Sequence, residues 1–282
     1  MPEWSCVNGR YGPIDEATVP INDRGFLFGD SVYEVFHVHD GRLWAAERHY
    51  RRLGRSLEAI GLNADLEAIR GWVDETLRQS RLAEAMVYLH VTRGVAPRNH
   101  AFPPDLKPTV VITVRPLVAM PEAERRRGVK AITVPEVRWR RRDIKSTNLL
   151  PNVLAKQQAT RAGAYEALFV EADGTVNEGS STNVFLVRDG ALHTPAKGPQ
   201  ILPGITRDLL VETAREQGYA VEERTVQVSE LFEADEVFLS GTTTEALGVV
   251  EVDSRRIADG QVGLVTRGLF EAYSERVRQG RD

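Results

Sequence analysis

Residues 31–44 read SVYEVFHVHDGRLW, and this stretch decides the class of fold. From Val32 to His39 the side chains alternate between two faces, a period of two that is typical of a β-strand. Asp40-Gly41 then supplies the dipeptide that a tight hairpin turn requires. We therefore expect two antiparallel strands that meet at this turn.

Outward from this hairpin, the first part of the chain mixes helices and strands. Apolar residues recur at helical spacing over 53–60 and 66–77, and the strand-like stretches MVYLHVTR and TVVITVRP follow. The next segment, LVAMPEAERRRG, is polar and contains a proline, as linkers often do. We predict an N-terminal α/β domain over residues 1–117 and a linker over 118–126.

The second half is richer in strands. Strand-like stretches occur at VKAITVPEV, EALFVE, NVFLVRDG and DEVFLS, and the run WRRRDIK also has a strand pattern. LLPNVLAKQQATRAG and PGITRDLLVETAREQG have the character of helices, and each ends on a glycine, which is a stop signal. We predict a larger, barrel-like C-terminal domain over residues 127–282 and an α/β (α+β) fold of two domains.

Composition excludes several classes of function. The chain has 282 residues, a formal net charge of -4 and one cysteine, Cys6. This charge gives no global attraction to nucleic acid or to an anionic membrane, and one cysteine cannot form an intrachain disulfide. The sequence has no apolar run long enough to span a membrane. We expect a soluble cytoplasmic protein that binds neither nucleic acid nor membrane, and we expect no metal.

The stretch RRDIKSTNLL, residues 141–150, contains the residue that indicates chemistry. Only five of the 36 basic residues are lysines, so arginine is the usual choice for a positive charge. Lysine alone offers an amine that can lose its proton and act as a nucleophile or Schiff-base partner. Lys145 lies where the WRRRDIK pattern gives way to a helix, and the alternative is a solvated lysine at the end of a strand.

If Lys145 binds a carbonyl cofactor, pyridoxal phosphate makes further demands that the sequence can meet. Its pyridinium nitrogen needs a carboxylate, and VNEGSSTNVF supplies Glu178 before a turn. Its phosphate needs backbone N–H groups at the start of a helix, and ILPGITRDLL supplies Ile205 and Thr206 just after Pro203-Gly204. Each residue alone also has an ordinary structural explanation.

Other residues are candidates for phosphate and substrate contacts. Thr242 in SGTTTEALG and Arg52 in HYRRLGRSLEAI could assist with the phosphate, although a strand-ending turn and a solvated arginine explain them equally well. An amino acid substrate carries a carboxylate that needs a cation and hydrogen-bond donors. Tyr33, Arg98 and His100 could supply these, the last two from a proline-bounded loop.

Several separated blocks, in one order, resemble the branched-chain and D-amino-acid aminotransferase family, the fold type IV pyridoxal phosphate enzymes. The blocks are similar to those of the D-amino-acid branch and extend over about residues 20–250; they are DRGFLFGDSVYEVF, VTRGVAPRNHAFP, DIKSTNLLPNVLAKQQA, VNEGSSTNVF, ILPGITRD and SGTTTE. A set of this kind is more specific than any single motif. The resemblance implies a smaller N-terminal α/β domain and a larger barrel-like domain.

The resemblance also implies roles for individual residues. Lys145 is the Schiff-base lysine and the proton carrier, and Glu178 pairs with the pyridine nitrogen. The phosphate is bound by Arg52, Ile205, Thr206 and Thr242, and Leu202 packs near the ring. Tyr33, Arg98 and His100 bind the substrate α-carboxylate, and the last two come from the partner subunit of a homodimer.

The function that the resemblance implies is transamination of a D-amino acid such as D-alanine with a 2-oxo acid such as 2-oxoglutarate. Three enzymes of the same fold remain as alternatives: an (R)-selective amine transaminase, an L-branched-chain aminotransferase and an aminodeoxychorismate lyase. A noncatalytic protein that binds a small molecule is the alternative from another class.

Overall fold

The computed structural model describes residues 3–282, which divide into two compact units. Unit 1 extends to Val118 and also includes Ile144–Asn148, whereas unit 2 comprises Ala119–Asp143 and Leu149–Asp282. The expected linker, 118–126, begins at the first boundary, and helix α4 (Glu122–Arg127) occupies its last part. The chain therefore returns to unit 1 for a short segment that contains Lys145.

Unit 1 is built on one antiparallel sheet of six strands in the order β2-β1-β6-β5-β3-β4. The expected hairpin is confirmed, because β3 and β4 pair directly across Asp40-Gly41. In chain order the elements are β1 (Trp4–Val7), β2 (Arg10–Pro13), the 3₁₀ helix η1 (Ile14–Glu16), α1 (Arg24–Phe28), β3 (Ser31–His39), β4 (Arg42–Leu43), α2 (Ala46–Ala59), α3 (Leu66–Ser80), β5 (Ala85–Thr92) and β6 (Thr109–Pro116).

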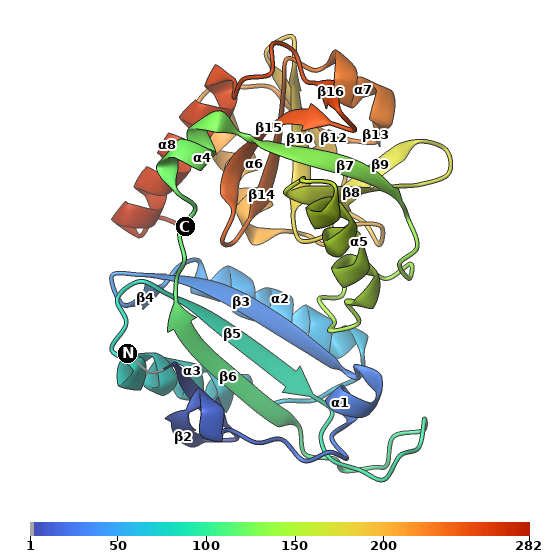
Figure 1. Cartoon of the computed structure of the whole chain (residues 1–282). Coiled ribbons are helices and arrows are strands. Elements are labelled where there is room, and N and C mark those ends of the chain that lie inside the picture. Colours follow the sequence, from blue (N-terminus) through green and yellow to red (C-terminus); the bar gives the residue numbers. More distant parts are fainter. Residues whose placement is uncertain (1–2) are drawn as a thin grey trace. The chain divides into compact units, whose positions relative to one another are not determined.

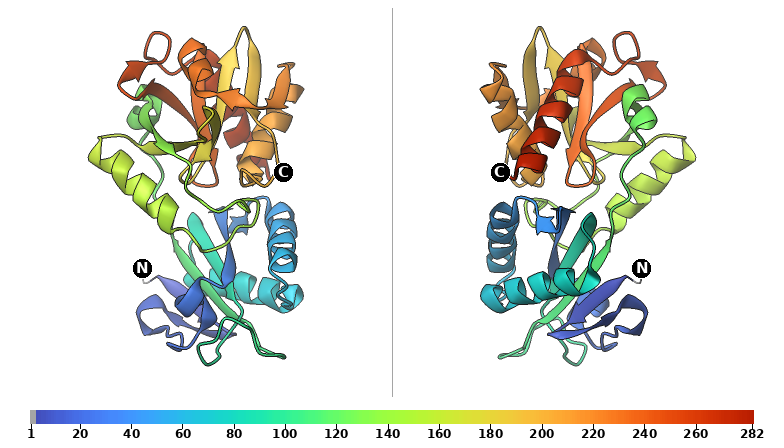
Figure 2. Two further views of the ribbon diagram at one scale, coloured as in Figure 1. Left: turned by 90° about the vertical axis from the view of Figure 1, so that its right-hand side faces the viewer. Right: turned by 90° about the vertical axis from the view of Figure 1, so that its left-hand side faces the viewer.

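Helices α2 and α3 cover one face of this sheet (Figures 1 and 2). Val32, Phe36 and Val38 of β3 point toward the helices and pack in one buried core with Leu53 and Leu57 of α2. Tyr33, Val35, His37 and His39 alternate with these residues along β3 and therefore lie on the opposite face, as the period of a strand requires.

Unit 2 is built on a ten-stranded mixed sheet in the order β12-β11-β10-β14-β15-β7-β8-β9-β13, with β16 paired to β15. The strands are β7 (Val129–Pro135), β8 (Glu166–Val170), β9 (Thr175–Gly179), β10 (Asn183–Arg188), β11 (Ala191–Pro195), β12 (Val221–Arg224), β13 (Val226–Gln227), β14 (Glu236–Gly241), β15 (Glu245–Val252) and β16 (Arg255–Arg256). Only Thr225 separates β12 from β13, the two end strands, so the sheet curls back on itself. The predicted barrel-like domain is confirmed.

The helices of unit 2 are α4, α5 (Leu150–Arg161), α6 (Ile205–Glu216), α7 (Val228–Glu233) and α8 (Leu264–Gln279). Helices α6 and α8 pack against each other and against the sheet at β14 (Figure 2). None of the described helices combines the length and hydropathy that a membrane span requires.

One predicted strand is wrong. The run WRRRDIK, residues 139–145, forms turns and irregular backbone. Arg142 is bound by Glu136 and Glu171 from outside the run, and Arg141 pairs with Asp143 within it, so ion pairs rather than a strand ladder hold this segment. Lys145 therefore does not end a strand, although Ser146 beside it forms an isolated bridge with Val32 of β3.

Candidate functional site

Lys145 is fixed against β3 and α2 of unit 1. Its backbone N–H donates to Ser56 Oγ at 3.2 Å, and its carbonyl accepts from the Tyr33 N–H at 2.9 Å. Ile144 anchors the segment in the core of unit 1. The Lys145 ammonium lies 4.2 Å from the centroid of the Tyr33 ring, and among residues 3–282 no carboxylate forms an ion pair with it. The structure therefore brings Lys145 and Tyr33 together and leaves the amine without a fixed counterion.

Arg52 is buried, so the alternative of a solvated arginine is wrong. Its guanidinium donates Nε to Glu34 Oε1 at 2.7 Å and Nη2 to Glu34 Oε2 at 2.8 Å, a bidentate pair on the apolar side of β3. His49 Nδ1 lies 2.7 Å from Glu34 Oε2. Burial alone would raise the pKa of Glu34, but Arg52 and His49 hold it well below its usual range. Arg52 is thus a rigid, permanently charged side chain.

Glu34 and His49 were not singled out in the sequence, although a signal was available. Glu34 occupies an inward position of β3 between Val32 and Phe36. An acidic residue on an otherwise apolar face must find a cation, because an unpaired buried carboxylate is costly. The partners come from α2, which is close along the chain.

Arg98 and His100 lie together in the exposed loop that follows β5. Both contact the Phe28 ring: the Arg98 guanidinium is 5.2 Å from its centroid, and the two ring centroids of His100 and Phe28 are 5.5 Å apart. Arg24 also donates to the His100 carbonyl at 3.1 Å, so α1 holds the loop. No described contact joins this pair to Tyr33, which stacks on Tyr88 at a centroid distance of 5.2 Å.

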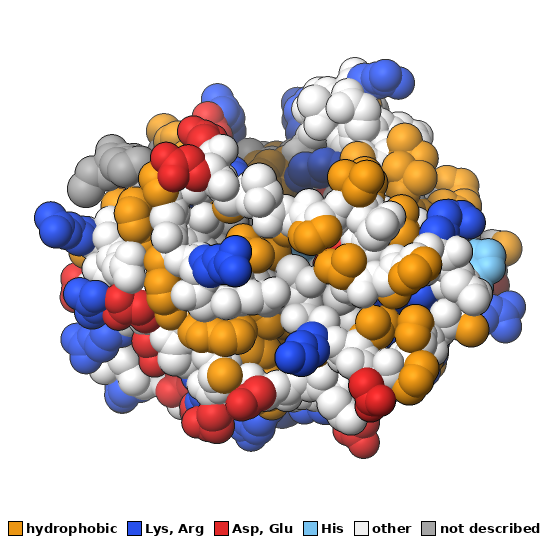
Figure 3. Space-filling view, turned by 90° about the horizontal axis from the view of Figure 1, so that it is seen from below, with side chains coloured by type: hydrophobic (Ala, Val, Ile, Leu, Met, Phe, Trp, Pro, Cys, Tyr) orange, Lys and Arg blue, Asp and Glu red, His pale blue; other side chains and the backbone are white. Residues whose placement is uncertain are grey.

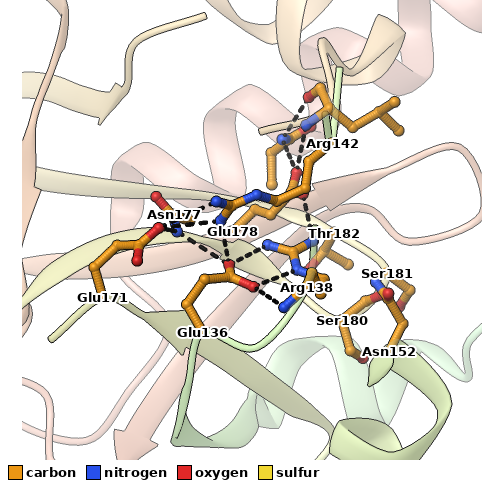
Figure 4. Close-up of polar contacts among 12 residues, drawn as sticks. Glu136, Arg138, Arg142, Asn152, Glu171, Asn177, Glu178, Ser180, Ser181 and Thr182 are labelled. Atoms are coloured by element: carbon orange, nitrogen blue, oxygen red, sulfur yellow. Dashed lines mark hydrogen bonds and ion pairs between the residues drawn. The ribbon is translucent and has the colours of Figure 1, made fainter. Parts of the chain in front are cut away.

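Glu178, on β9 of unit 2, is a buried carboxylate with three donors (Figure 4). Oε1 accepts from Arg138 Nη1 at 2.7 Å, and Oε2 accepts from the Leu202 N–H at 2.9 Å and from Asn183 Nδ2 at 3.2 Å. Burial raises the pKa of Glu178, and Arg138 opposes that rise. The structure therefore brings Glu178 and Leu202 into direct contact and fixes the direction of the carboxylate.

Arg138 belongs to a chain of alternating charges that Figure 4 shows. It binds Glu136 through Nη2 at 2.7 Å and stacks over the Phe169 ring with its guanidinium 4.0 Å from the centroid. Glu136 also pairs with Arg142, and Arg142 pairs with Glu171 at 3.2 Å. Arg142 is therefore a buried member of this chain of charges, whereas its neighbour Arg141 forms an exposed ion pair with Asp143.

The N-terminus of α6 offers backbone N–H groups. Gly204 is the N-cap residue and no side chain caps the helix, so the N–H groups of the first turn at Ile205 and Thr206 are available to an anion. A Cβ atom at Gly204 would lie 2.1 Å from Asn183 Oδ1, so only glycine fits there. The prediction that the helix begins at Pro203-Gly204 is confirmed. Thr242 is half-buried in the turn after β14, and no described contact joins it to α6.

The candidate residues thus form two sets, one in each unit. Unit 1 contains an amine that has no carboxylate partner among the described residues, together with guanidinium, imidazole and phenol side chains; the set is Tyr33, Arg52, Arg98, His100 and Lys145. Unit 2 contains a buried carboxylate, an uncapped helix N-terminus and nearby residues, namely Glu178, Leu202, Ile205, Thr206 and Thr242. Their chemistry suits a covalent amine bond, an anionic phosphate and a basic ring nitrogen.

Comparisons with known proteins agree with this chemistry. Residues 31–252 match the model of the amino-transferase class IV family. The chain is 38% identical over 275 residues to a D-alanine aminotransferase of Staphylococcus epidermidis, covering 96% of this chain and 97% of that protein. It is 38% identical over 272 residues to a D-alanine aminotransferase of Bacillus licheniformis, covering 96% of this chain and 95% of that protein.

Solved structures share the fold. The branched-chain amino acid aminotransferase of Escherichia coli has a TM-score of 0.91 at 25% identity and covers 100% of this chain and 97% of its own. The T.th. branched-chain amino acid aminotransferase, solved with pyridoxamine 5'-phosphate, has a TM-score of 0.91 at 28% identity. The match covers 100% of this chain and 96% of that chain.

Proposed function

The chain belongs to the class IV aminotransferase family, and we propose that it is a pyridoxal-phosphate-dependent D-amino-acid aminotransferase. It transfers the amino group of a D-amino acid such as D-alanine to a 2-oxo acid such as 2-oxoglutarate. The observation that carries the proposal is the 38% identity, over 96% of the chain, to proteins named D-alanine aminotransferase.

The donor sets of both units fit pyridoxal phosphate. Glu178 is a buried carboxylate whose direction is fixed by three donors, as a partner for a pyridinium nitrogen must be. The uncapped first turn of α6, at Ile205 and Thr206, suits a phosphate, with Thr242 as a further hydroxyl and Arg52 as a cation. Leu202 would pack beside the ring, and the Lys145 amine would hold the cofactor covalently. When bound, the cofactor supplies an electron sink for negative charge at the substrate Cα.

The residues of the chain perform the remaining work. Lys145 Nζ removes the proton from the substrate Cα as a general base and later returns a proton as an acid. Arg138 keeps Glu178 in place and supplies a fixed positive charge beside it. The bidentate bond to Glu34 prevents Arg52 from changing its rotamer, so its cation is preorganised.

We further propose that Tyr33, Arg98 and His100 bind the substrate α-carboxylate, and that the last two act on the site of a partner subunit in a homodimer. Arg98 and His100 are exposed and lie on a loop held by α1, so they are free to meet another chain. Large hydrophobic side chains are exposed in the same part of unit 1: Phe26 is 77% exposed and Phe102 is 57% exposed. Figure 3 shows hydrophobic side chains at several places on the face seen from below.

A rate assay tests the proposal. Glutamate formation from 2-oxoglutarate is measured with added cofactor, with D-alanine as donor beside L-alanine, L-leucine and (R)-1-phenylethylamine. D-alanine should give a higher rate than (R)-1-phenylethylamine, which has no carboxylate for the carboxylate-binding residues, and a higher rate than L-alanine and L-leucine if the chain shares the specificity that its relatives' names state. A higher rate with L-leucine would favour a branched-chain aminotransferase, which the structural neighbours make the main competitor. Lys145→Ala should have no turnover, and residual transamination without added amine would place the nucleophile elsewhere.

A further inference from the structure

His37 is a buried histidine whose ring nitrogens lack hydrogen-bond partners. It lies on β3 with only 8% of its side chain exposed, and among the described residues neither Nδ1 nor Nε2 has a hydrogen-bond partner. A buried polar group left in this state costs about 1–3 kcal/mol. A native protein retains such a group when something else satisfies it, such as a water, an ion or a catalytic role.

Strand β3 pairs with β5 (Figure 1), and the register of this pairing places other ligand-type residues next to His37. His39 is two residues further along β3 and therefore on the same face. Val38 pairs with Ala85, so Glu84, just before β5, falls opposite His39. Asp40 is the first residue of the hairpin turn.

The distances in this cluster suit a shared ion. Glu84 Oε2 lies 3.9 Å from His37 Nε2, and Glu84 Oε1 lies 2.9 Å from His39 Nδ1. Asp40 Oδ2 lies 3.8 Å from His39 Nε2, and ligand atoms of His39, Asp40 and Glu84 lie within 4.8 Å of one another. Ligand atoms around a tetrahedral zinc ion, with bonds of about 2.0–2.2 Å, are about 3.4 Å apart.

The donor types select the kind of ion. Two imidazoles and a carboxylate suit a divalent transition metal of the zinc type, whereas magnesium and calcium prefer oxygen ligands alone. The side chain of Glu84 is 49% exposed and that of Asp40 is 68% exposed, so an ion can enter from solvent.

We infer that His39, Asp40 and Glu84 form a binding site for a divalent transition-metal ion such as Zn²⁺, and that the buried His37 ring, which faces Glu84, supplies a further nitrogen ligand. Tyr33 lies on the same face four residues earlier, about 13 Å along the strand. The ion therefore takes no part in the amino-transfer reaction and instead stabilises the hairpin end of the sheet in unit 1.

Zinc binding to the untagged, cofactor-loaded protein tests the inference. After treatment with EDTA, titration calorimetry with Zn²⁺ should show one site per chain, and Co²⁺ should give the visible absorption of an ion with nitrogen ligands. Zn²⁺ should also raise the melting temperature, because an ion that binds only the folded state stabilises it.

Substitutions assign the site to these residues. His37→Ala and Glu84→Gln should each weaken Zn²⁺ binding about tenfold or more and reduce the thermal shift. His193→Gln is the matched control, because His193 Nδ1 also faces one carboxylate, Glu222 Oε2 at 3.1 Å, and it should bind Zn²⁺ normally. Glu84 is half exposed, so Glu84→Gln keeps the test valid if His37→Ala does not fold. Absence of Zn²⁺ binding, or binding that Glu84→Gln leaves unchanged, would overturn the inference.

Discussion

Replacing Arg138 with glutamine should destabilise unit 2 far more than the same change at Arg141. The Arg138 side chain is 6% exposed and binds Glu178 and Glu136, each at 2.7 Å. The side chain of Glu178 is 6% exposed and that of Glu136 is 3% exposed. Its removal takes from Glu178 its arginine partner and leaves Glu136 with Arg142 as its arginine partner. Breaking a buried ion pair by removing one partner costs about 3–5 kcal/mol.

Arg141→Gln provides a matched control three residues further along the chain. Arg141 binds Asp143 at 3.0 Å, but its side chain is 50% exposed. Exposed ion pairs of this kind contribute about 0.2–1 kcal/mol. The two variants therefore remove the same side chain from the same irregular segment and differ mainly in burial.

Urea denaturation followed by circular dichroism measures both variants, and the absorbance of bound pyridoxal phosphate reports on the site. Arg138→Gln should lower the free energy of unfolding by about 3–5 kcal/mol. It should also raise the pKa of Glu178 further, since the main opposing influence on that pKa is gone, and so weaken cofactor binding. Arg138→Lys keeps the charge but loses the planar guanidinium, so its loss should be intermediate. Equal losses in Arg138→Gln and Arg141→Gln would refute the reasoning.

Further predictions concern single residues. Burial lowers the pKa of His49. Below about pH 6.5 the unfolded chain therefore binds more protons than the native one. The free energy of unfolding should fall by up to about 1.4 kcal/mol per pH unit as the pH is lowered toward pH 5. Urea midpoints at several pH values measure this slope, and His49→Asn should flatten it. Gly204→Ala should cost about 1–3 kcal/mol because the new Cβ meets Asn183 Oδ1, whereas Gly268→Ala, which meets nothing within 4 Å, should cost nothing in a thermal melt. Arg98→Ala should raise KM for D-alanine about tenfold or more, because the substrate carboxylate loses a charged hydrogen bond. The absorbance of the bound cofactor should stay unchanged. An unchanged KM would show that Arg98 does not bind the carboxylate.

Local periodicity was enough to predict most elements of the fold. The alternation before Asp40-Gly41 gave β3 and its turn, and the spacing from Leu53 gave the apolar face of α2. The glycine before Ile205 marked the start of α6. These features depend on residues close together in the chain, so a single sequence contains the whole signal.

The irregular segment around Trp139 could not be predicted, because its structure depends on residues that are far apart in the chain. Its arginines bind Glu171 and Glu178, which are far along the chain, so the pattern of charges shows a need for partners without naming them. The pair of Arg52 with Glu34, 18 residues apart, differs, because an acidic residue on the apolar face of a strand already signals the need for a nearby cation. The charge of a residue is visible in a sequence, but its burial depends on tertiary contacts.

The chain uses arginine for most of its positive charges and lysine rarely, and this difference made Lys145 recognisable in the sequence as a candidate reactive residue. Several buried cations are arginines bound to carboxylates: Arg24, Arg52, Arg93, Arg142 and Arg207. Arginine keeps its charge under all ordinary conditions, so it can neutralise a buried carboxylate without titrating. Three of the other lysines, Lys130, Lys156 and Lys197, form ion pairs, and Lys107 is exposed. Within residues 3–282, Lys145 is half-buried beside Tyr33 and has no carboxylate partner, so no ion pair holds its amine away from a reacting group.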